Sequence, residues 1–513
     1  MRSTSPGFAS GFVAGFGAGF VAATFSGGGL DEVECAGLAC VEHRVPITRD
    51  TRFLAASLSK QFTAALVYLL AAEGRLDLDG PVPDLALSPS LRDITPRQLL
   101  THTSGLRDPW LARAAAGLRP DDVVTTADVR HFLRRARGPE TEPGHRFLYC
   151  NVGYTLLALV VEAVNGRPFA QVAGSRLFAP LGMADTAVVE DPTAVVPSLA
   201  TAYDASGGRH LPARYLTIGS TGVCTTVGDL ALWGHNLATG TVGGPDFVEA
   251  MARPGSAADG QAIGYGFGLS IRDVDGTTVQ LHGGSDGGYR AFFINLPRLD
   301  AGCVVLANSS GVDAAALATG RARRILRPGV PQPTATPDAG AAEGGWFTGP
   351  PGWSSLHVDV VGGGLVLGDG DTLEPVRAGC YGSADGSVTL TLDEHGAVSS
   401  SSAGSATYLA VEPSPPTAPR WVGVFHSDEL DITYAIRHGA RGLELHRARV
   451  GGQALVALGP DLLGVTLDGP EGFRLAFDLV PMGTGSKVDA FALRACGLHA
   501  PNHGVRFDRT EDA

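Results

Sequence analysis

The chain has 513 residues, of which 52 are acidic and 39 basic, so its formal net charge is −13. A chain this acidic lacks the positive patches of a general nucleic-acid binder or a polybasic membrane anchor. Hydrophobic residues make up 44% and charged residues 18%, which fits large globular cores and excludes a wholly disordered chain. Seven cysteines are too few for a disulfide scaffold. We therefore expect reduced thiols in a cytoplasmic protein.

The N-terminal segment allows two interpretations. Arg2 and the glycine-diluted apolar residues up to Phe25 fit a signal peptide, and the protein is secreted if residues 1–23 act as one. Alternatively, residues 19–25 form a strand that turns at three glycines into a second strand at 30–40. We favour the strands, because cleavage near residue 23 removes a hairpin that the next element needs. No long, strongly apolar run follows, so we expect no transmembrane helix and no membrane partner.

Two proline-rich linkers divide the chain. Residues 328–345 and 412–419 have no periodicity, and four prolines in the second forbid a helix or an inner strand. The expected domains are therefore 1–330, 346–411 and 420–513.

The three parts differ in their hydrophobic patterns. The first has helical patterns and strand-like runs, with helices expected at 57–73, 151–165 and 227–238. The two later parts alternate apolar and polar residues in short runs, at 356–360, 387–392 and 430–436. This alternation predicts two small antiparallel β domains, as barrels or sandwiches.

The first candidate site is Ser57-Leu58-Ser59-Lys60. A helix that begins here places Ser57 in its first turn, where backbone N–H groups favour developing negative charge. Lys60 then lies one turn later on the same face. Lysine occurs only at positions 60 and 487, whereas the other 37 basic residues are arginine. A partly desolvated lysine can activate a neighbouring hydroxyl, although a helix-capping serine and a solvated lysine fit the pattern too.

Two further motifs stand at element ends. Tyr149-Cys150-Asn151 directly precedes the second helix, which Asn151 is expected to cap, and it is the only Tyr-x-Asn in the chain. His282-Gly283-Gly284 ends a strand-like run at 277–281, where glycine lets another backbone approach the strand edge. The neighbouring Gly-x-Ser-x-Gly around Ser285 fits a nucleophile elbow. We disfavour the elbow because residues 289–296 read as a strand rather than a helix.

Together the three motifs resemble those of the penicillin-recognising serine hydrolases, which include class C β-lactamases, D,D-carboxypeptidases and D-aminopeptidases. Residues 51–60, 99–106, 177–186, 222–233 and 304–308 carry further similarity, so the resemblance covers roughly 19–327. It implies an α/β (α+β) domain, with an antiparallel sheet flanked by helices and a mostly helical insertion at 75–220. The three-part layout and the opening of the last part at 421–434 resemble D-aminopeptidase, which implies two lipocalin-like β-barrels, the last one contributing a loop at the active site.

The resemblance also implies roles for the matched residues. Ser57 looks like the nucleophile, and Lys60 and Tyr149 like the pair that moves its proton. His282 stands where the D,D-carboxypeptidase and D-aminopeptidase branches carry histidine, and it is the fourth expected catalytic residue. Asn151 would hold the substrate amide. The backbone N–H groups of Ser57 and of Ser285, which follows Gly284, would form the oxyanion hole.

Three departures from the family pattern matter. Cys150 replaces the usual serine, the N-terminal helix is missing or glycine-rich, and His282 replaces the lysine of β-lactamases. Because histidine is mostly neutral at pH 7, the last departure disfavours a β-lactamase. The resemblance thus implies a D-aminopeptidase-like serine acyl hydrolase acting on short peptides, amides or esters with N-terminal D-residues.

Other readings stay open. One is a general esterase or β-lactamase-like hydrolase, and another is a non-catalytic penicillin-binding sensor. The β domains could instead serve as spacers or as contacts in a homodimer. We expect no metal and no cofactor, because His102 has no partner at ligand spacing and is interpreted as a structural turn histidine.

Overall fold

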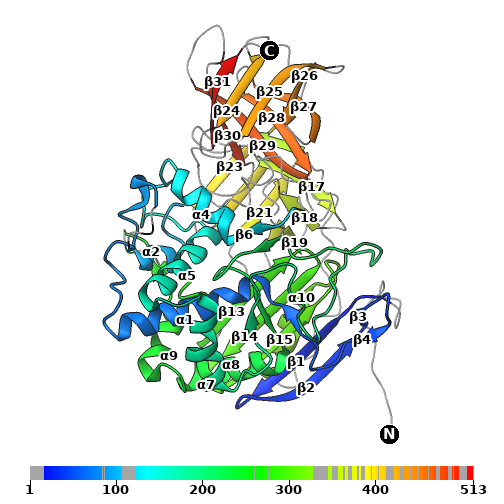
Figure 1. Cartoon of the computed structure of the whole chain (residues 1–513). Coiled ribbons are helices and arrows are strands. Elements are labelled where there is room, and N and C mark those ends of the chain that lie inside the picture. The colour runs from blue at the N-terminus through cyan, green and yellow to red at the C-terminus, as the bar shows by residue number, and fades with distance from the viewer. Residues whose placement is uncertain are drawn as a thin grey trace.

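The computed structural model describes residues 17–326, apart from positions 84, 86, 107–121, 140, 259, 261 and 275. Beyond these, it describes 345–348, 356–361, 364–367, 372–377, 380–382, 388–393, 396–401, 404–411, 421–427, 432–439, 442–447, 450–459, 462–468, 474–482, 488, 490–495 and 505–511. The central sheet of the first part has six antiparallel strands in the order β12-β13-β14-β15-β1-β2 (Figure 1). Their bounds are β12 Ser270–Val274, β13 Thr277–Asp286, β14 Tyr289–Leu296, β15 Ala301–Ala307, β1 Phe20–Ser26 and β2 Gly29–Ala36.

The N-terminal hairpin is an integral part of this sheet. β1 pairs with β15 on one side and with β2 on the other, and the turn between β1 and β2 uses Gly27 and Gly28 at positive φ. The prediction of strands here is therefore confirmed. The second predicted strand is interrupted, however, because Gly37 has a φ of +79° and separates β2 from β3, Leu38–Cys40, which pairs with β4, Val45–Pro46. Residues 1–16 of the possible signal peptide 1–23, together with the segment where the N-terminal helix is expected, lie outside the described residues.

Each face of the sheet is covered by helices. Alternate side chains point to opposite faces of a strand, and on β1 Ala22 joins the cluster that includes Ala318 of α10, Ala314–Leu326. Val21 and Phe25 join the opposite core, which includes Leu230 and Trp233 of α8, Val227–Thr239, and also α1, Ser59–Ala72. This second core underlies the site described below.

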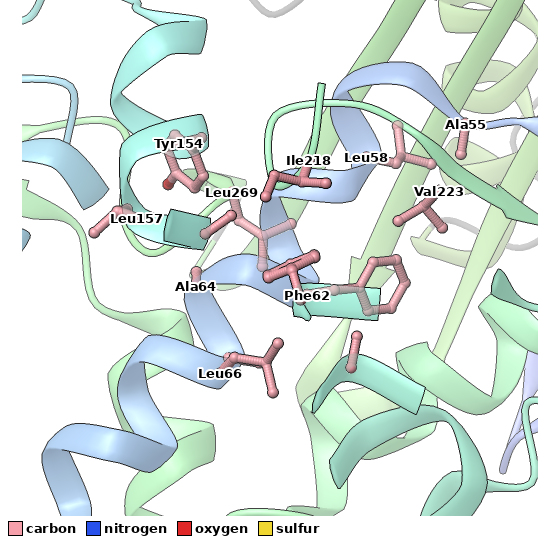
Figure 2. Close-up of a cluster of buried hydrophobic side chains, with 14 of the residues drawn as sticks. Ala55, Leu58, Phe62, Ala64, Leu66, Tyr154, Leu157, Ile218, Val223 and Leu269 are labelled. Atoms are coloured by element: carbon pink, nitrogen blue, oxygen red, sulfur yellow. The ribbon is translucent and has the colours of Figure 1, made fainter. Parts of the chain in front are cut away.

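The predicted insertion at 75–220 lies in the region between β4 and β10, where helices alternate with loops and short strands. Its described helices are η1 Ala56–Leu58, α1, η2 Pro89–Leu91, α2 Pro96–Leu100, α4 Thr126–Arg135, α5 Asn151–Asn165, α6 Phe169–Ala173, the π-helical η3 Gly174–Phe178, α7 Ala179–Leu181, α8 and α9 Gly244–Ala252. Short strands accompany them: β5 Phe53–Leu54, β6 Val124–Thr125, β7 Ala187–Val188, β8 Tyr215–Leu216, β9 Val223–Thr225, β10 Gly255–Ser256 and β11 Ala262–Ile263. Figure 2 shows side chains of α1, among them Phe62, in one apolar cluster with Tyr154 and Leu157 of α5. No described helix is both long and apolar enough to cross a bilayer.

The described C-terminal stretches form two sets of eight antiparallel strands (Figure 1, yellow to red). Each set closes on itself, because β16 pairs with β23 and β24 pairs with β31. The first set is β16 Gly345–Thr348, β17 Leu356–Val361, β18 Gly364–Leu367, β19 Thr372–Arg377, β20 Cys380–Gly382, β21 Val388–Asp393, β22 Gly396–Ser401 and β23 Gly404–Val411. The second is β24 Gly423–Ser427, β25 Ile432–Gly439, β26 Gly442–Arg447, β27 Val450–Gly459, β28 Leu462–Asp468, β29 Arg474–Met482, β30 Ala490–Ala495 and β31 Val505–Glu511.

The two linkers predicted from composition cannot be described. Residues 327–344 and 412–420 lie outside the described residues, so the linkers stay predictions. The strand predictions at 356–360, 387–392 and 430–436 correspond to β17, β21 and β25, with β25 beginning two residues later than expected.

Candidate active site

Ser57 lies in a tight turn at the start of α1. The turn, η1 Ala56–Leu58, is a 3₁₀ helix that runs directly into α1, so Ser57 precedes the α-helix rather than lying in its first turn. Ala56 adopts the left-handed φ of +47°, an uncommon conformation for alanine. Ser59 Oγ secures the turn, because it donates to the carbonyl of Ala56 at 2.7 Å and accepts the N–H of Val223 at 3.1 Å. The Ser57 side chain is thereby left half-buried rather than packed in the core.

Lys60 is the buried cation of the site. Its side chain is fully buried, and Nζ donates to Ser57 Oγ at 3.0 Å, Asn151 Oδ1 at 2.7 Å and the carbonyl of Ser220 at 3.1 Å. An ammonium has three N–H donors, so these three acceptors match its capacity and offset the loss of hydration. Nζ also lies 4.8 Å from the ring centroid of Tyr149, within cation–π range.

Tyr149 and Asn151 come from the segment that enters α5. Tyr149 Oη donates to Ser57 Oγ at 3.1 Å, so the serine hydroxyl contacts both candidate proton carriers. Asn151 is the first residue of α5, and the N-cap position belongs to Cys150, which makes no capping hydrogen bond. The predicted capping role of Asn151 is therefore wrong. Its carboxamide binds Lys60 instead, which is a tertiary contact across 91 residues.

His282 faces the same cluster from β13. Its side chain is 7% exposed, its Nε2 lies 2.9 Å from Tyr265 Oη, and its Nδ1 lies 2.6 Å from the carbonyl of Gly283. The centroid of its ring lies 6.3 Å from that of Tyr149. The structure thus gathers Ser57, Lys60, Tyr149, Asn151 and His282 in one place, although they come from three separate segments of the chain.

Gly284 explains why β13 can lie beside the serine turn. A Cβ on Gly284 would come within 2.4 Å of the carbonyl oxygen of Ala55, so only glycine allows this approach. Ser285 follows as an exposed residue within β13, paired with Arg290 of β14. Because the chain continues as strand through Asp286 and then enters β14, no helix follows Ser285. The nucleophile-elbow alternative is wrong.

Three contributors to the site were not singled out as functional in the sequence. The Ser220 carbonyl comes from the loop between β8 and β9, and Tyr265 lies in the loop between β11 and β12. Burial, together with the neighbouring Tyr154 and Tyr149, raises the pKa of Tyr265 well above its usual range, so its phenol stays protonated at neutral pH. The glycines on both sides of Tyr265 were the only local signal that could have drawn attention to it.

His102 is the third, and its prediction as a turn histidine agrees with the structure. It has a φ of +56°, its side chain is 1% exposed, and its ring centroid lies 4.3 Å from that of Tyr149. Among the described residues no group of three His, Cys, Asp or Glu side chains is placed to hold a metal ion.

Comparison with known proteins identifies a family for the first part of the chain. The beta-lactamase family model matches residues 10–327. A D-aminopeptidase from Brucella anthropi is 33% identical over 259 residues, which is 50% of this chain and 49% of that protein. The chain thus spans about half the length of this curated relative.

Solved structures show the same fold. The penicillin binding protein from Bacillus halodurans is 26% identical with a TM-score of 0.52, and the match covers 60% of this chain and 95% of that one. The octameric penicillin-binding protein homologue from Pyrococcus abyssi is 20% identical with a TM-score of 0.55, covers 96% of both chains and supports the fold alone. Since the family model covers more than half of the chain, the protein belongs to the beta-lactamase family, a family of serine hydrolases.

Proposed function

We propose that the protein is a D-aminopeptidase-like serine hydrolase in which Ser57 forms the acyl-enzyme. The observation that carries the proposal is the environment of the Ser57 hydroxyl, which lies 3.0 Å from Lys60 Nζ and 3.1 Å from Tyr149 Oη. A serine is a weak nucleophile until a neighbouring group accepts its proton. Here two such groups contact the hydroxyl oxygen.

The proposed reaction has two halves. In the first, the Tyr149–Lys60 pair acts with one proton removed from its ammonium or its phenol, so it accepts the proton of Ser57 as Ser57 Oγ attacks the substrate carbonyl carbon. The pair then protonates the leaving amine or alcohol as the bond to the carbonyl carbon breaks, leaving an ester on Ser57. In the second half, water attacks this ester, gives up its proton to the same pair, and the acid product leaves as Ser57 regains its hydrogen.

The remaining residues are proposed to hold the substrate. The backbone N–H groups of Ser57 and Ser285 would bind the oxyanion, and the approach of β13 to the serine turn at Gly284 supports this pairing. Asn151 would orient the substrate amide while it also binds Lys60. His282 would border the site opposite Ser57, held by Tyr265.

The proposed substrates are short peptides, amides or esters with N-terminal D-residues. Support comes from the Brucella anthropi relative, which is named D-aminopeptidase. We further propose that residues 346–411 and 420–513 are separate lipocalin-like barrel domains that limit access to the site. Arg137, which follows α4, lies 3.9 Å from Asp508 of β31, so the second barrel contacts the helical region.

The test compares four chromogenic substrates on the full chain: D-alanine p-nitroanilide, its L-enantiomer, a p-nitrophenyl ester and a cephalosporin. We expect a preference for the D-anilide over the L-anilide and weak cephalosporin turnover. Equal rates on both enantiomers would favour the alternative of a general esterase. Fast cephalosporin turnover would favour the β-lactamase-like alternative. Binding of a penicillin without turnover of any substrate would favour the sensor.

A pair of serine variants tests the nucleophile. Ser57→Ala should abolish hydrolysis, with a loss of at least about 10³-fold, and should abolish labelling by a serine-directed covalent probe mapped by mass spectrometry. Ser285→Ala is the matched control, because only its backbone N–H is used and alanine keeps that group. The opposite result, with Ser285 labelled and essential, would overturn the proposal.

A further inference from the structure

His102 binds the chain on both sides of Tyr149. Its backbone carbonyl accepts the N–H of Leu148 at 2.7 Å, and its Nδ1 accepts the N–H of Cys150 at 3.1 Å. These two bonds hold the residues immediately before and after Tyr149. One buried residue therefore determines where the Tyr149 backbone lies relative to the serine turn.

The imidazole of His102 also positions the Tyr149 side chain. Its ring centroid lies 4.3 Å from that of Tyr149, with the planes tilted by 41°. Tyr265 and Tyr154 pack against the same imidazole, with centroid distances of 4.7 Å and 5.0 Å. The Tyr149 phenol is thereby supported on the side of His102 while its Oη reaches Ser57.

The charge of His102 suits this role. Nδ1 can accept the Cys150 N–H only when it carries no proton, which requires the neutral imidazole. Burial, followed by the positive charges of Lys60 and His282, holds the pKa of His102 well below its usual range. The other groups that face it, Tyr149, Tyr154 and Tyr265, are phenols. His102 therefore remains a hydrogen-bond acceptor through the neutral pH range.

The backbone of His102 has an uncommon conformation that the surrounding contacts must hold in place. Its φ of +56° lies in the left-handed region, which is uncommon for residues other than glycine and is better tolerated by Asn, Asp and His than by other side chains. Such conformations persist where the surrounding contacts determine them. Here those contacts are the two bonds to the segment that carries Tyr149.

We infer that His102 is a positioning residue for Tyr149, acting through the two flanking amides and the ring contact rather than on the substrate. The inference rests on the proposed function, because it requires Tyr149 to carry the proton of Ser57. It predicts that loss of His102 reduces turnover through Tyr149 alone.

A double-mutant cycle on the full chain tests this, with p-nitrophenyl acetate as substrate. Tyr149→Phe should lower kcat at least about 10²-fold, as expected for loss of a general acid–base group. His102→Leu should lower kcat by a similar factor with KM changed less than about threefold, because small misplacement of a catalytic group can cost this much. The double variant should be no slower than Tyr149→Phe, since both changes remove the function of the same group, the Tyr149 phenol.

Two further variants separate positioning from packing. His102→Asn keeps an oxygen acceptor for the Cys150 amide and tolerates the left-handed φ, so it should retain kcat within about tenfold. Phe147→Leu alters another ring that contacts His102, with a centroid distance of 5.7 Å, but removes neither anchoring bond, so its kcat should stay near that of the parent. If His102→Leu does not fold, His102→Asn takes its place in the cycle. Its small reduction of kcat should then disappear when Tyr149→Phe is already present.

The outcomes distinguish the two proposals. Full activity of Tyr149→Phe would overturn the proposed role of Tyr149 and this inference with it. Two outcomes would overturn the inference alone, provided that Tyr149→Phe is inactive. In one, the losses of the two single variants add up in the double variant. In the other, His102→Leu is folded and fully active.

Discussion

Lys60 shows at the level of a single side chain why arginine cannot replace lysine. Its three N–H groups point to three acceptors on Ser57, Asn151 and Ser220, which lie in different parts of the chain. A guanidinium is planar, presents its donors in a fixed fork and does not give up a proton near neutral pH. Lys60→Arg should therefore lower kcat for a p-nitrophenyl ester at least about 10²-fold while the positive charge remains.

The only other lysine in the chain offers a matched control for this substitution. Lys487→Arg makes the same exchange far along the chain, outside the described residues, and should leave the rate unchanged. Circular dichroism checks that both variants are folded. A Lys60→Arg enzyme with normal turnover would remove Lys60 from the proton pathway.

His102 gives a prediction of stability against pH. Its pKa is depressed in the folded protein by burial and by the charges of Lys60 and His282, whereas in the unfolded chain it returns to about 6.5. Below that pH the unfolded chain binds the extra proton, so the free energy of unfolding falls as pH falls towards the folded pKa. The slope for one proton is up to about 1.4 kcal/mol per pH unit.

Comparison with His102→Asn isolates this contribution. Denaturant unfolding between pH 7 and pH 4.5 should show the parent losing stability more steeply than the variant, because asparagine does not titrate. Parallel curves would mean that His102 titrates normally in the folded protein.

At the level of elements, the contact between β13 and the serine turn is the one that leaves no room for a side chain. A methyl group on Gly284 would meet the carbonyl oxygen of Ala55 at 2.4 Å, whereas one on the neighbouring Gly283 would lie at an ordinary 3.4 Å from the ring of Phe292. Gly284→Ala should push β13 away from Ser57 and lower kcat/KM about 10²-fold or more, because the proposed oxyanion site spans this contact. Gly283→Ala should change it only a few-fold. Similar losses in both variants would argue against an oxyanion site that depends on this approach.

At the level of the whole molecule, the described cores are separate. The clusters beneath and above the central sheet draw only on residues 20–326, while the cluster centred on Trp421 and Phe491 draws only on residues of the second barrel. A chain ending near Pro328 should therefore fold in one cooperative transition and hydrolyse a simple p-nitrophenyl ester. If the barrels limit access, its discrimination between D- and L-alanine p-nitroanilide should weaken. An unchanged profile in the folded truncated chain would contradict the proposed role of the barrels.

Local physics allowed several elements to be predicted from the sequence. The observed bounds of α5 and β14 are those predicted, because an apolar helical stripe ending at a left-handed Gly166 and a short, mostly apolar run are local patterns. The one-turn spacing of Ser57 and Lys60 is equally local, and it survives although the turn is 3₁₀ rather than α-helical. The β1–β2 hairpin followed from its glycine turn.

The composition of the site was decided by tertiary structure. Asn151 binds Lys60 rather than its own helix end, because burial of an ammonium requires acceptors from whichever segments pack around it. Ser220 and Tyr265 contribute through loops whose local sequences carry no periodic signal. His102 could be recognised as a turn residue, but its two bonds around Tyr149 depend on how the segment before α5 packs against the end of α2. Sequence by itself thus determined which residues carry reactive groups and which short elements hold them, because those depend on neighbours along the chain. Their distances and partners came only from packing between distant segments.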